Sequence, residues 1–300
     1  MILFFYLTKN AIGDRIHSVI AYTKGRFTMI DINKLYRFDD EDELPLEGLV
    51  TNGGMCGILR KVGCVGDSLS SGEFQSRNAE GKPGYYDLYD YSWGQYMARE
   101  AGLTAYNFSK GGMTAKVFID SFGKTKGFYD DDKKCPAYVI ALGVNDITRA
   151  INGILPFGEV EDFNIEAPEK SKDSFCGYYG RIISEIKSMQ PKARIFLMTI
   201  PRGDTVQERI DYCEKHAEVL YKFAEMFEFT YVLDLRKYGP AYDADFRKRF
   251  FLDGHMNAAG YQFHARIVMS YIDYIIRHNM DDFTQISFVG HFDHNVNYKW

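Results

Sequence analysis

The sequence contains no long apolar run and no positively charged segment ahead of its apolar N-terminus. Nowhere do about 18 consecutive apolar residues occur, the length that a membrane-spanning helix requires. Residues 1–7 are apolar, but the run is too short for the apolar part of a secretory signal. We therefore expect a soluble, cytoplasmic protein without a membrane span, although a secreted chain that has lost its leader shows the same pattern.

Positive charge is also scarce. The chain carries 36 Lys and Arg against 41 Asp and Glu, a formal net charge of −5, and its longest basic run is Arg247-Lys248-Arg249. Nucleic-acid binding needs a basic surface, so we expect no nucleic-acid partner. Neither a G-x-x-x-x-G-K-[ST] loop nor a Gly-rich dinucleotide fingerprint is present, which argues against a nucleotide- or phosphate-binding protein.

Cysteine is infrequent and unpatterned. The chain has five, with no C-x-x-C pair, which indicates free thiols in a reducing compartment. His291 and His294 form an H-x-x-H pair near the C-terminus, but two ligands without a third are weak evidence for a metal. We expect no metal and no organic cofactor.

Short apolar runs dominate what the sequence does contain. Each is bounded by Gly, Pro, Asp or Lys, as is typical of strands buried on both faces of a parallel sheet. The predicted strands are Val62–Gly66, Ala105–Phe108, Ala137–Leu142, Arg194–Ile200 and Tyr231–Leu235. The predicted helices between and after them are Ser92–Ala101, Ser174–Met189, Thr205–Phe227 and Ala258–His278.

Alternation of strands and helices predicts an α/β fold, a three-layer α/β/α sandwich whose functional crevice lies beyond the carboxyl ends of the strands. Residues 1–55, with a possible strand over Phe27–Ile32, are expected to be an extension that packs on the main domain of residues 56–300. We expect Gly81–Tyr91 to form a loop close to the site, and we find no clear periodicity after Asp281.

A serine follows the first predicted strand, in Gly66-Asp67-Ser68-Leu69-Ser70. A serine at a strand-to-loop turn exposes its hydroxyl at the crevice, which suits a nucleophile. Taken in isolation, the motif is better explained by Ser68 as the cap of a short helix. Ser70 and Ser71 are alternatives that lie further from the strand end.

Three further motifs follow strands or precede the last helix. Gly111-Gly112 after the second strand lets backbone approach a ligand closely, and Asn145 after the third is an uncharged donor that suits an oxyanion. Ordinary turns explain either one alone. His255 lies just before the last predicted helix, where its near-neutral pKa suits a general base.

In this order, the four motifs resemble the SGNH (GDSL-type) hydrolase family over roughly Lys61 to His278. The resemblance implies a parallel five-stranded flavodoxin-like sheet of strand order 2-1-3-4-5 and serine esterase chemistry. By the same resemblance, Ser68 is the nucleophile and His255 the base. The implied oxyanion hole consists of the Ser68 N–H, the Gly112 N–H and the Asn145 side chain; Gly112 aligns rather than Gly111 when Asn107 is matched to the family's Asn.

The family's triad acid stands three residues before the histidine, where this chain has Leu252. Asp253 stands only two residues before it and is the candidate third member. The alternatives are a Ser–His dyad or orientation of His255 by a backbone carbonyl, by water, or by Asp243 or Asp245.

The substrate is less constrained than the chemistry. A cluster of aromatic residues after the serine favours a carbohydrate ester, because their rings can stack on sugars, although they equally suit core packing. The residues are Tyr85, Tyr86, Tyr89, Tyr91 and Trp93. We expect removal of an acetyl or short acyl group from a carbohydrate. The alternatives are a lipase or thioesterase that acts on acyl lipids, and a catalytically silent sugar-binding module.

Overall fold

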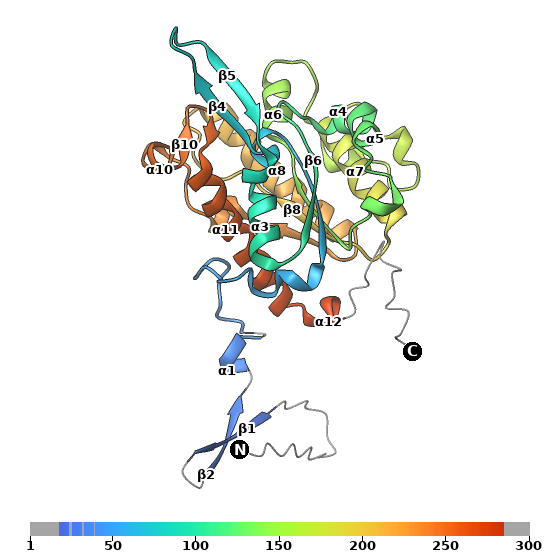
Figure 1. The fold of residues 1–300 in the computed structure, drawn as a ribbon. Helices are drawn as coiled ribbons and strands as arrows, with labels where there is room; N and C mark the ends of the chain where they lie inside the picture. Colours follow the sequence, from blue (N-terminus) through green and yellow to red (C-terminus); the bar gives the residue numbers. More distant parts are fainter. Residues whose placement is uncertain (1–17, 24–25, 32, 39, 285–300) are drawn as a thin grey trace. The chain divides into compact units, whose positions relative to one another are not determined.

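The computed structural model describes residues 18–23, 26–31, 33–38 and 40–284 (Figure 1). Its contacts divide the chain into two units, residues 1–43 and 44–300. In the first unit, β1 (Ser18–Thr23) and β2 (Arg26–Asp31) form an antiparallel hairpin followed by α1 (Asn33–Tyr36). A strand was expected at Phe27–Ile32, which β2 largely covers. His291 and His294 lie outside the described residues.

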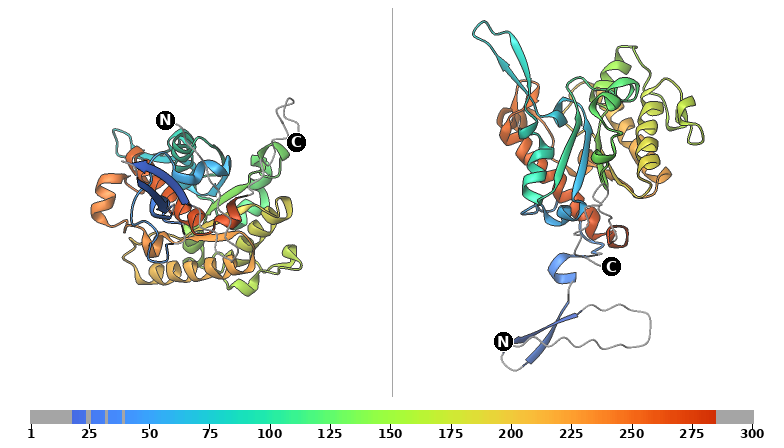
Figure 2. Two further views of the ribbon diagram at one scale, coloured as in Figure 1. Left: turned by 90° about the horizontal axis from the view of Figure 1, so that it is seen from below. Right: turned by 45° about the vertical axis from the view of Figure 1, so that its right-hand side comes forward.

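The second unit is built on a five-stranded parallel sheet. Its spatial order is β6-β3-β7-β8-β9, which confirms the predicted order 2-1-3-4-5 (Figures 1 and 2). The strands are β3 (Lys61–Gly66), β6 (Thr104–Ser109), β7 (Ala137–Ala141), β8 (Arg194–Met198) and β9 (Thr230–Leu233). All five predicted strands are present, with ends that differ by one or two residues.

Helices cover both faces of this sheet. On one face pack α6 (Val144–Ile151), α7 (Phe175–Met189) and α8 (Gln207–Met226), and on the other α3 (Trp93–Ala101) and α11 (Ala258–Arg277). The shorter helices are α2 (Ser68–Ser71), α4 (Ala115–Val117), α5 (Gly123–Lys126), α9 (Leu235–Tyr238), α10 (Ala244–Phe250) and α12 (Met280–Phe283). Within the described residues, no helix is both long and apolar enough to cross a bilayer.

Alternate residues of each central strand face the two helical layers, as the two-residue repeat of a strand requires. In β7, Tyr138 and Ile140 face α7 and α8, while Ala137 and Val139 face α3 and α11. Burial on both faces explains why these strands are continuous apolar runs in the sequence. All five cysteines are free and buried in these layers.

Two small antiparallel hairpins supplement the sheet. β4 (Glu73–Arg77) pairs with β5 (Pro83–Asp87), and β10 (Phe251–Leu252) pairs with β11 (His255–Met256). The prediction of a loop over Gly81–Tyr91 is therefore wrong for Pro83–Asp87, which forms a strand. Its Pro, Gly and exposed Tyr side chains give no pattern of burial, so the pairing with β4 determines its structure.

Residues 44–55, which we assigned from sequence to the N-terminal extension, belong to the second unit. The backbone N–H of Val50 donates to Ser270 Oγ at 2.9 Å, and that of Met55 to Asp273 Oδ1 at 2.8 Å. Both acceptors belong to α11, so this segment is attached to the main fold through hydrogen bonds.

The turn after β7 depends on one glycine. Gly143 has φ of +135°, and a Cβ atom there would lie 2.5 Å from His216 Nε2. His216 is fully buried, burial lowers its pKa to about 4, and its Nε2–H donates to the Leu142 carbonyl at 2.9 Å. This neutral imidazole therefore supports the loop from which Asn145 extends.

We expect Gly143→Ala to lower the free energy of unfolding by about 1–3 kcal/mol, because the new methyl group meets both an unfavourable φ and His216. Gly48→Ala is the matched control, since no atom lies within 4 Å of its Cβ position. Urea unfolding of both variants measures the difference. Equal stability of the two would contradict this account of the turn.

Candidate active site

Ser68 lies directly after β3, at the first position of α2. The cap of this helix is Asp67, whose carboxylate accepts a hydrogen bond from the Leu69 N–H at 3.0 Å, so Ser68 is not the cap. Within the described part of the chain, the Ser68 hydroxyl has no hydrogen-bond partner; its backbone carbonyl accepts bonds from Ser71 and Tyr261. The hydroxyl is therefore available to a ligand.

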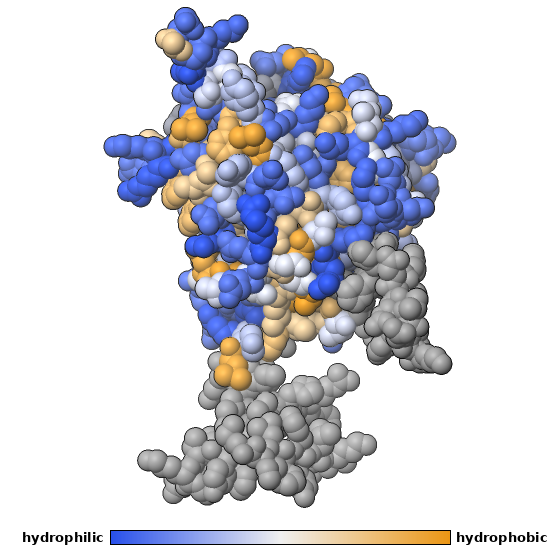
Figure 3. All heavy atoms as spheres, viewed as in Figure 1, coloured by the Kyte–Doolittle hydropathy of each residue, from blue (hydrophilic) through white to orange (hydrophobic). Residues whose placement is uncertain are grey.

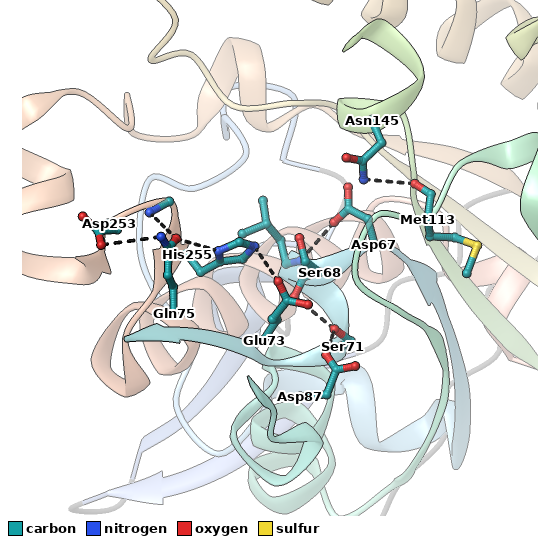
Figure 4. A network of polar contacts seen from close by, with 12 residues as sticks. Asp67, Ser68, Ser71, Glu73, Gln75, Asp87, Met113, Asn145, Asp253 and His255 are labelled. Atoms are coloured by element: carbon teal, nitrogen blue, oxygen red, sulfur yellow. Dashed lines mark hydrogen bonds and ion pairs between the residues drawn. The ribbon is translucent and has the colours of Figure 1, made fainter. Parts of the chain in front are cut away.

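A cavity of about 310 Å³ brings together Ser68, Asn145 and His255 on its lining. Ser68 follows β3, Asn145 follows β7, and His255 lies in the hairpin before α11. These segments are far apart in the sequence. Figure 4 shows His255 on one side of Ser68 and Asn145 on the other. Gly112 is not among the residues that line this cavity.

His255 is held by the β4–β5 hairpin rather than by an aspartate. Its Nδ1 donates to Gln75 Oε1 at 3.3 Å, and the same oxygen accepts the Gly254 N–H at 2.9 Å. Its Nε2 lies 3.1 Å from Glu73 Oε1 (Figure 4). Nδ1–H donation fixes the tautomer in which Nε2 carries the lone pair, as a general base requires.

Within the described residues, Asp253 makes no hydrogen bond or ion pair with His255. Its carboxylate accepts from Arg77 Nε at 2.7 Å and, at 3.5 Å, from Gln75 Nε2. The reason is local: Asp253 and Gly254 form the turn of the β10–β11 hairpin, with φ of Asp253 at +53°. In this turn Leu252, the position of the family's acid, pairs directly across from His255.

The other two aspartates considered also serve elsewhere. Asp243 caps α10 through a hydrogen bond from the Phe246 N–H at 2.9 Å, and Asp245 is exposed in the first turn of that helix. No hydrogen bond or ion pair of the described chain joins either one to His255.

The β4–β5 hairpin supplies functional side chains that the sequence analysis missed. Glu73, Gln75 and Arg77 alternate along β4 and face the His255 hairpin, while Phe74 between them packs against Tyr261. Tyr85 pairs directly with Gln75, and its ring lies 5.8 Å from the His255 ring at 80°. The polar alternation in Glu-Phe-Gln-Ser-Arg was the available signal.

Of the three predicted oxyanion donors, Ser68 and Asn145 line the cavity and Gly112 does not. The Asn145 side chain donates to the Met113 carbonyl at 3.1 Å, which leaves one of its two N–H groups free. The backbone N–H groups of Ser68 and Gly112 donate no hydrogen bond within the described residues. Gly112 has φ of +71°, a conformation that favours glycine, and a Cβ at Gly111 would displace the Glu73 carboxylate.

Burial shifts the titration of several groups here. It lowers the pKa of His255, which the negative charge of Asp87 opposes. It raises the pKa of Glu73, and Asp87, the residue directly opposite on β5, raises it further. Burial also raises the pKa of Asp67 and of Asp146 to about 7 each.

Across the described residues, no group of three or more His, Cys, Asp and Glu side chains is arranged to hold a metal ion. What the arrangement provides is an unpaired hydroxyl, an imidazole of fixed tautomer and free N–H donors around one cavity. Such a set suits nucleophilic attack on a carbonyl with stabilisation of the resulting oxyanion.

Comparisons with known proteins identify a family and solved structures to which this chain is similar. The family model described as GDSL-like Lipase/Acylhydrolase matches residues 64–263. A family two carbohydrate esterase from Clostridium thermocellum, solved with cellohexaose, has 19% identity and a TM-score of 0.52 over 72% of this chain and 64% of its own. An acetylxylan esterase from Geobacillus stearothermophilus has 17% identity and a TM-score of 0.45, over 71% and 94%. No curated protein sequence matches this chain.

The His255 environment gives a prediction that can be measured without a substrate. Because burial lowers its pKa, we expect the imidazole to titrate below the ordinary value of 6.5. Glu73→Gln removes a neighbour whose ionised form favours imidazolium, so the pKa of His255 should fall further. NMR titration of the ring protons checks both shifts. An unchanged pKa in the Glu73→Gln protein would show that Glu73 does not act on this ring, and an increase would contradict the expected sign of its effect.

Proposed function

The chain belongs to the GDSL-like lipase/acylhydrolase family, and from this premise we propose that it is a serine esterase that removes an acetyl or short acyl group from a carbohydrate. The observation that carries the proposal is the shared cavity of Ser68, His255 and Asn145. A nucleophile, a base and an oxyanion donor are the parts that acyl transfer needs at one reacting carbon.

In the proposed mechanism, His255 Nε2 accepts the Ser68 proton as the hydroxyl oxygen attacks the ester carbonyl. The free N–H of Asn145 and the backbone N–H of Ser68 stabilise the oxyanion, whereas Gly112, predicted from sequence as the third donor, is not among the residues that line this cavity. His255 then protonates the leaving alcohol and activates the water that hydrolyses the acyl-enzyme. Glu73 occupies the same imidazole nitrogen, so this contact must yield to Ser68 during attack.

We assign to Gln75 the position that an acidic residue holds in a triad. Its Oε1 accepts the Nδ1–H of His255, but a neutral amide stabilises imidazolium less than a carboxylate does. The Arg77 side chain keeps the Asp253 carboxylate in the adjacent hairpin turn. Gln75 is thus a positioning residue, and the catalytic pair is Ser68 and His255.

The carbohydrate part of the proposal is supported by exposed aromatic rings beside the base. Tyr85 and Tyr86 are 56% and 57% exposed on β5, and Tyr85 contacts the His255 ring edge to face. Exposed rings can stack on the apolar faces of sugars. By contrast, Trp93 is buried in the core and lines the cavity, and Tyr89 is half-buried with its hydroxyl enclosed.

The test is hydrolysis of p-nitrophenyl acetate and of acetylated sugars by the full chain and by Ser68→Ala. We expect turnover by the wild type, and a loss of several orders of magnitude in Ser68→Ala with unchanged thermal unfolding. Faster hydrolysis of long-chain esters or thioesters would favour a lipase or thioesterase. Binding of sugars without turnover of any ester would favour a silent binding module.

The roles of Gln75 and Asp253 are separable. We expect Gln75→Ala to lower kcat at least about tenfold, because the imidazole loses the acceptor that fixes its tautomer. Asp253→Asn should lower kcat by less than about tenfold. Gln75→Glu places a carboxylate at Nδ1, so the acid limb of the kcat/KM profile should move to higher pH. A large loss in Asp253→Asn alone would restore Asp253 as the third member of a triad.

A further inference from the structure

Three arginines line the cavity that contains Ser68. Arg202 lies in the loop after β8, Arg209 near the start of α8, and Arg247 in α10. Arg209 is neutralised, because its Nε donates to Asp204 Oδ1 at 2.9 Å. In the described part of the chain, Arg202 and Arg247 have no carboxylate partner and donate only to backbone carbonyls, those of Gly239 and Tyr242 respectively.

The two unpaired arginines are connected through one residue. The Tyr242 N–H donates to the Arg202 carbonyl at 2.6 Å, and the Tyr242 carbonyl accepts from Arg247 Nε at 3.2 Å. Gly203 makes this approach possible, since a Cβ there would lie 2.5 Å from the Tyr242 carbonyl oxygen and its φ is +151°. The backbone thus brings both guanidinium groups to one wall, and each uses one of its five N–H donors.

Little negative charge opposes them. Among the described residues, the carboxylates on the cavity lining are Asp204, which pairs with Arg209, and Asp67, which is buried and bonded to the Leu69 N–H. Arg202 and Arg247 are both exposed to solvent, and Arg247 also lies over the Phe251 ring at 4.7 Å. These two guanidinium groups therefore have no ionic partner among the described lining residues, although the whole chain has a net charge of −5. An uncharged ester can accept a hydrogen bond from them but supplies no opposite charge.

We propose that Arg202 and Arg247 bind a carboxylate of the substrate, so that the preferred ester carries a negative charge. This inference rests on the proposed esterase function and specifies its substrate class. Guanidinium groups bind carboxylates through paired, charge-assisted hydrogen bonds. The carboxylate belongs either to the alcohol, as in a uronic acid, or to the acyl group, as in the half-ester of a dicarboxylic acid.

The experiment compares charged and neutral substrates of equal shape. On the alcohol side, these are acetylated methyl glucuronoside and its uronamide; on the acyl side, p-nitrophenyl hydrogen adipate and its amide. We expect the wild type to prefer the acid of one pair by about tenfold in kcat/KM. The pair that shows the preference identifies which side carries the charge. Added NaCl should reduce this preference.

The variants Arg202→Gln and Arg247→Gln should each reduce the ratio of acid to amide by about three- to tenfold. Arg249→Gln is the matched control, because Arg249 lies on the same helix α10 but does not line the cavity. An equal ratio for acid and amide in both pairs, or equal losses for both substrates in the variants, would overturn the proposal.

Binding measurements distinguish a failure of the esterase proposal from a failure of the carboxylate-site proposal. If no ester is hydrolysed, calorimetric titration of the wild type with methyl glucuronoside and with adipate still tests the two arginines. Binding that weakens in Arg202→Gln and Arg247→Gln, but not in Arg249→Gln, would support the carboxylate site without the catalysis. Absence of binding in that case would overturn both proposals.

Discussion

One oxygen atom determines the geometry of the candidate site. Gln75 Oε1 accepts hydrogen bonds from the Gly254 backbone and from the His255 ring, and so joins two hairpins that are separated by about 180 residues. Glu73 at Nε2 and the Tyr85 ring complete the surroundings of the imidazole, so the β4–β5 hairpin supplies each of these contacts. The parallel sheet positions Ser68 and Asn145, and this hairpin holds His255 on the same cavity.

The sheet and the position of the serine were predictable because each depends on residues close in sequence. Strands buried on both faces are apolar throughout, and Gly66 to Ser68 follows such a strand directly. The role of Gln75 was not predictable in this way, since its partner His255 is remote in the chain. Likewise, sequence spacing placed Asp253 two residues from His255, whereas the turn conformation directs its carboxylate to Arg77.

Burial shifts the pKa of several groups near the site toward their neutral forms. It lowers the pKa of His216, which supports the loop of Asn145, to about 4, and it raises the pKa values of Asp67 and Asp146 to about 7. Backbone N–H groups bind one oxygen of each carboxyl, those of Leu69 and Ala115. The loops after β3, β6 and β7 are therefore fixed by hydrogen bonds rather than by ion pairs, and salt should affect them little.

Gln75 and Tyr85 face each other across the β4–β5 hairpin, and both contact His255. Under the proposed function, a sugar stacked on the Tyr85 ring would contact the same strand pair that holds the proposed base. Binding and turnover would then depend on one hairpin, and a substitution there that changes the preferred sugar would be expected to change the rate constant as well.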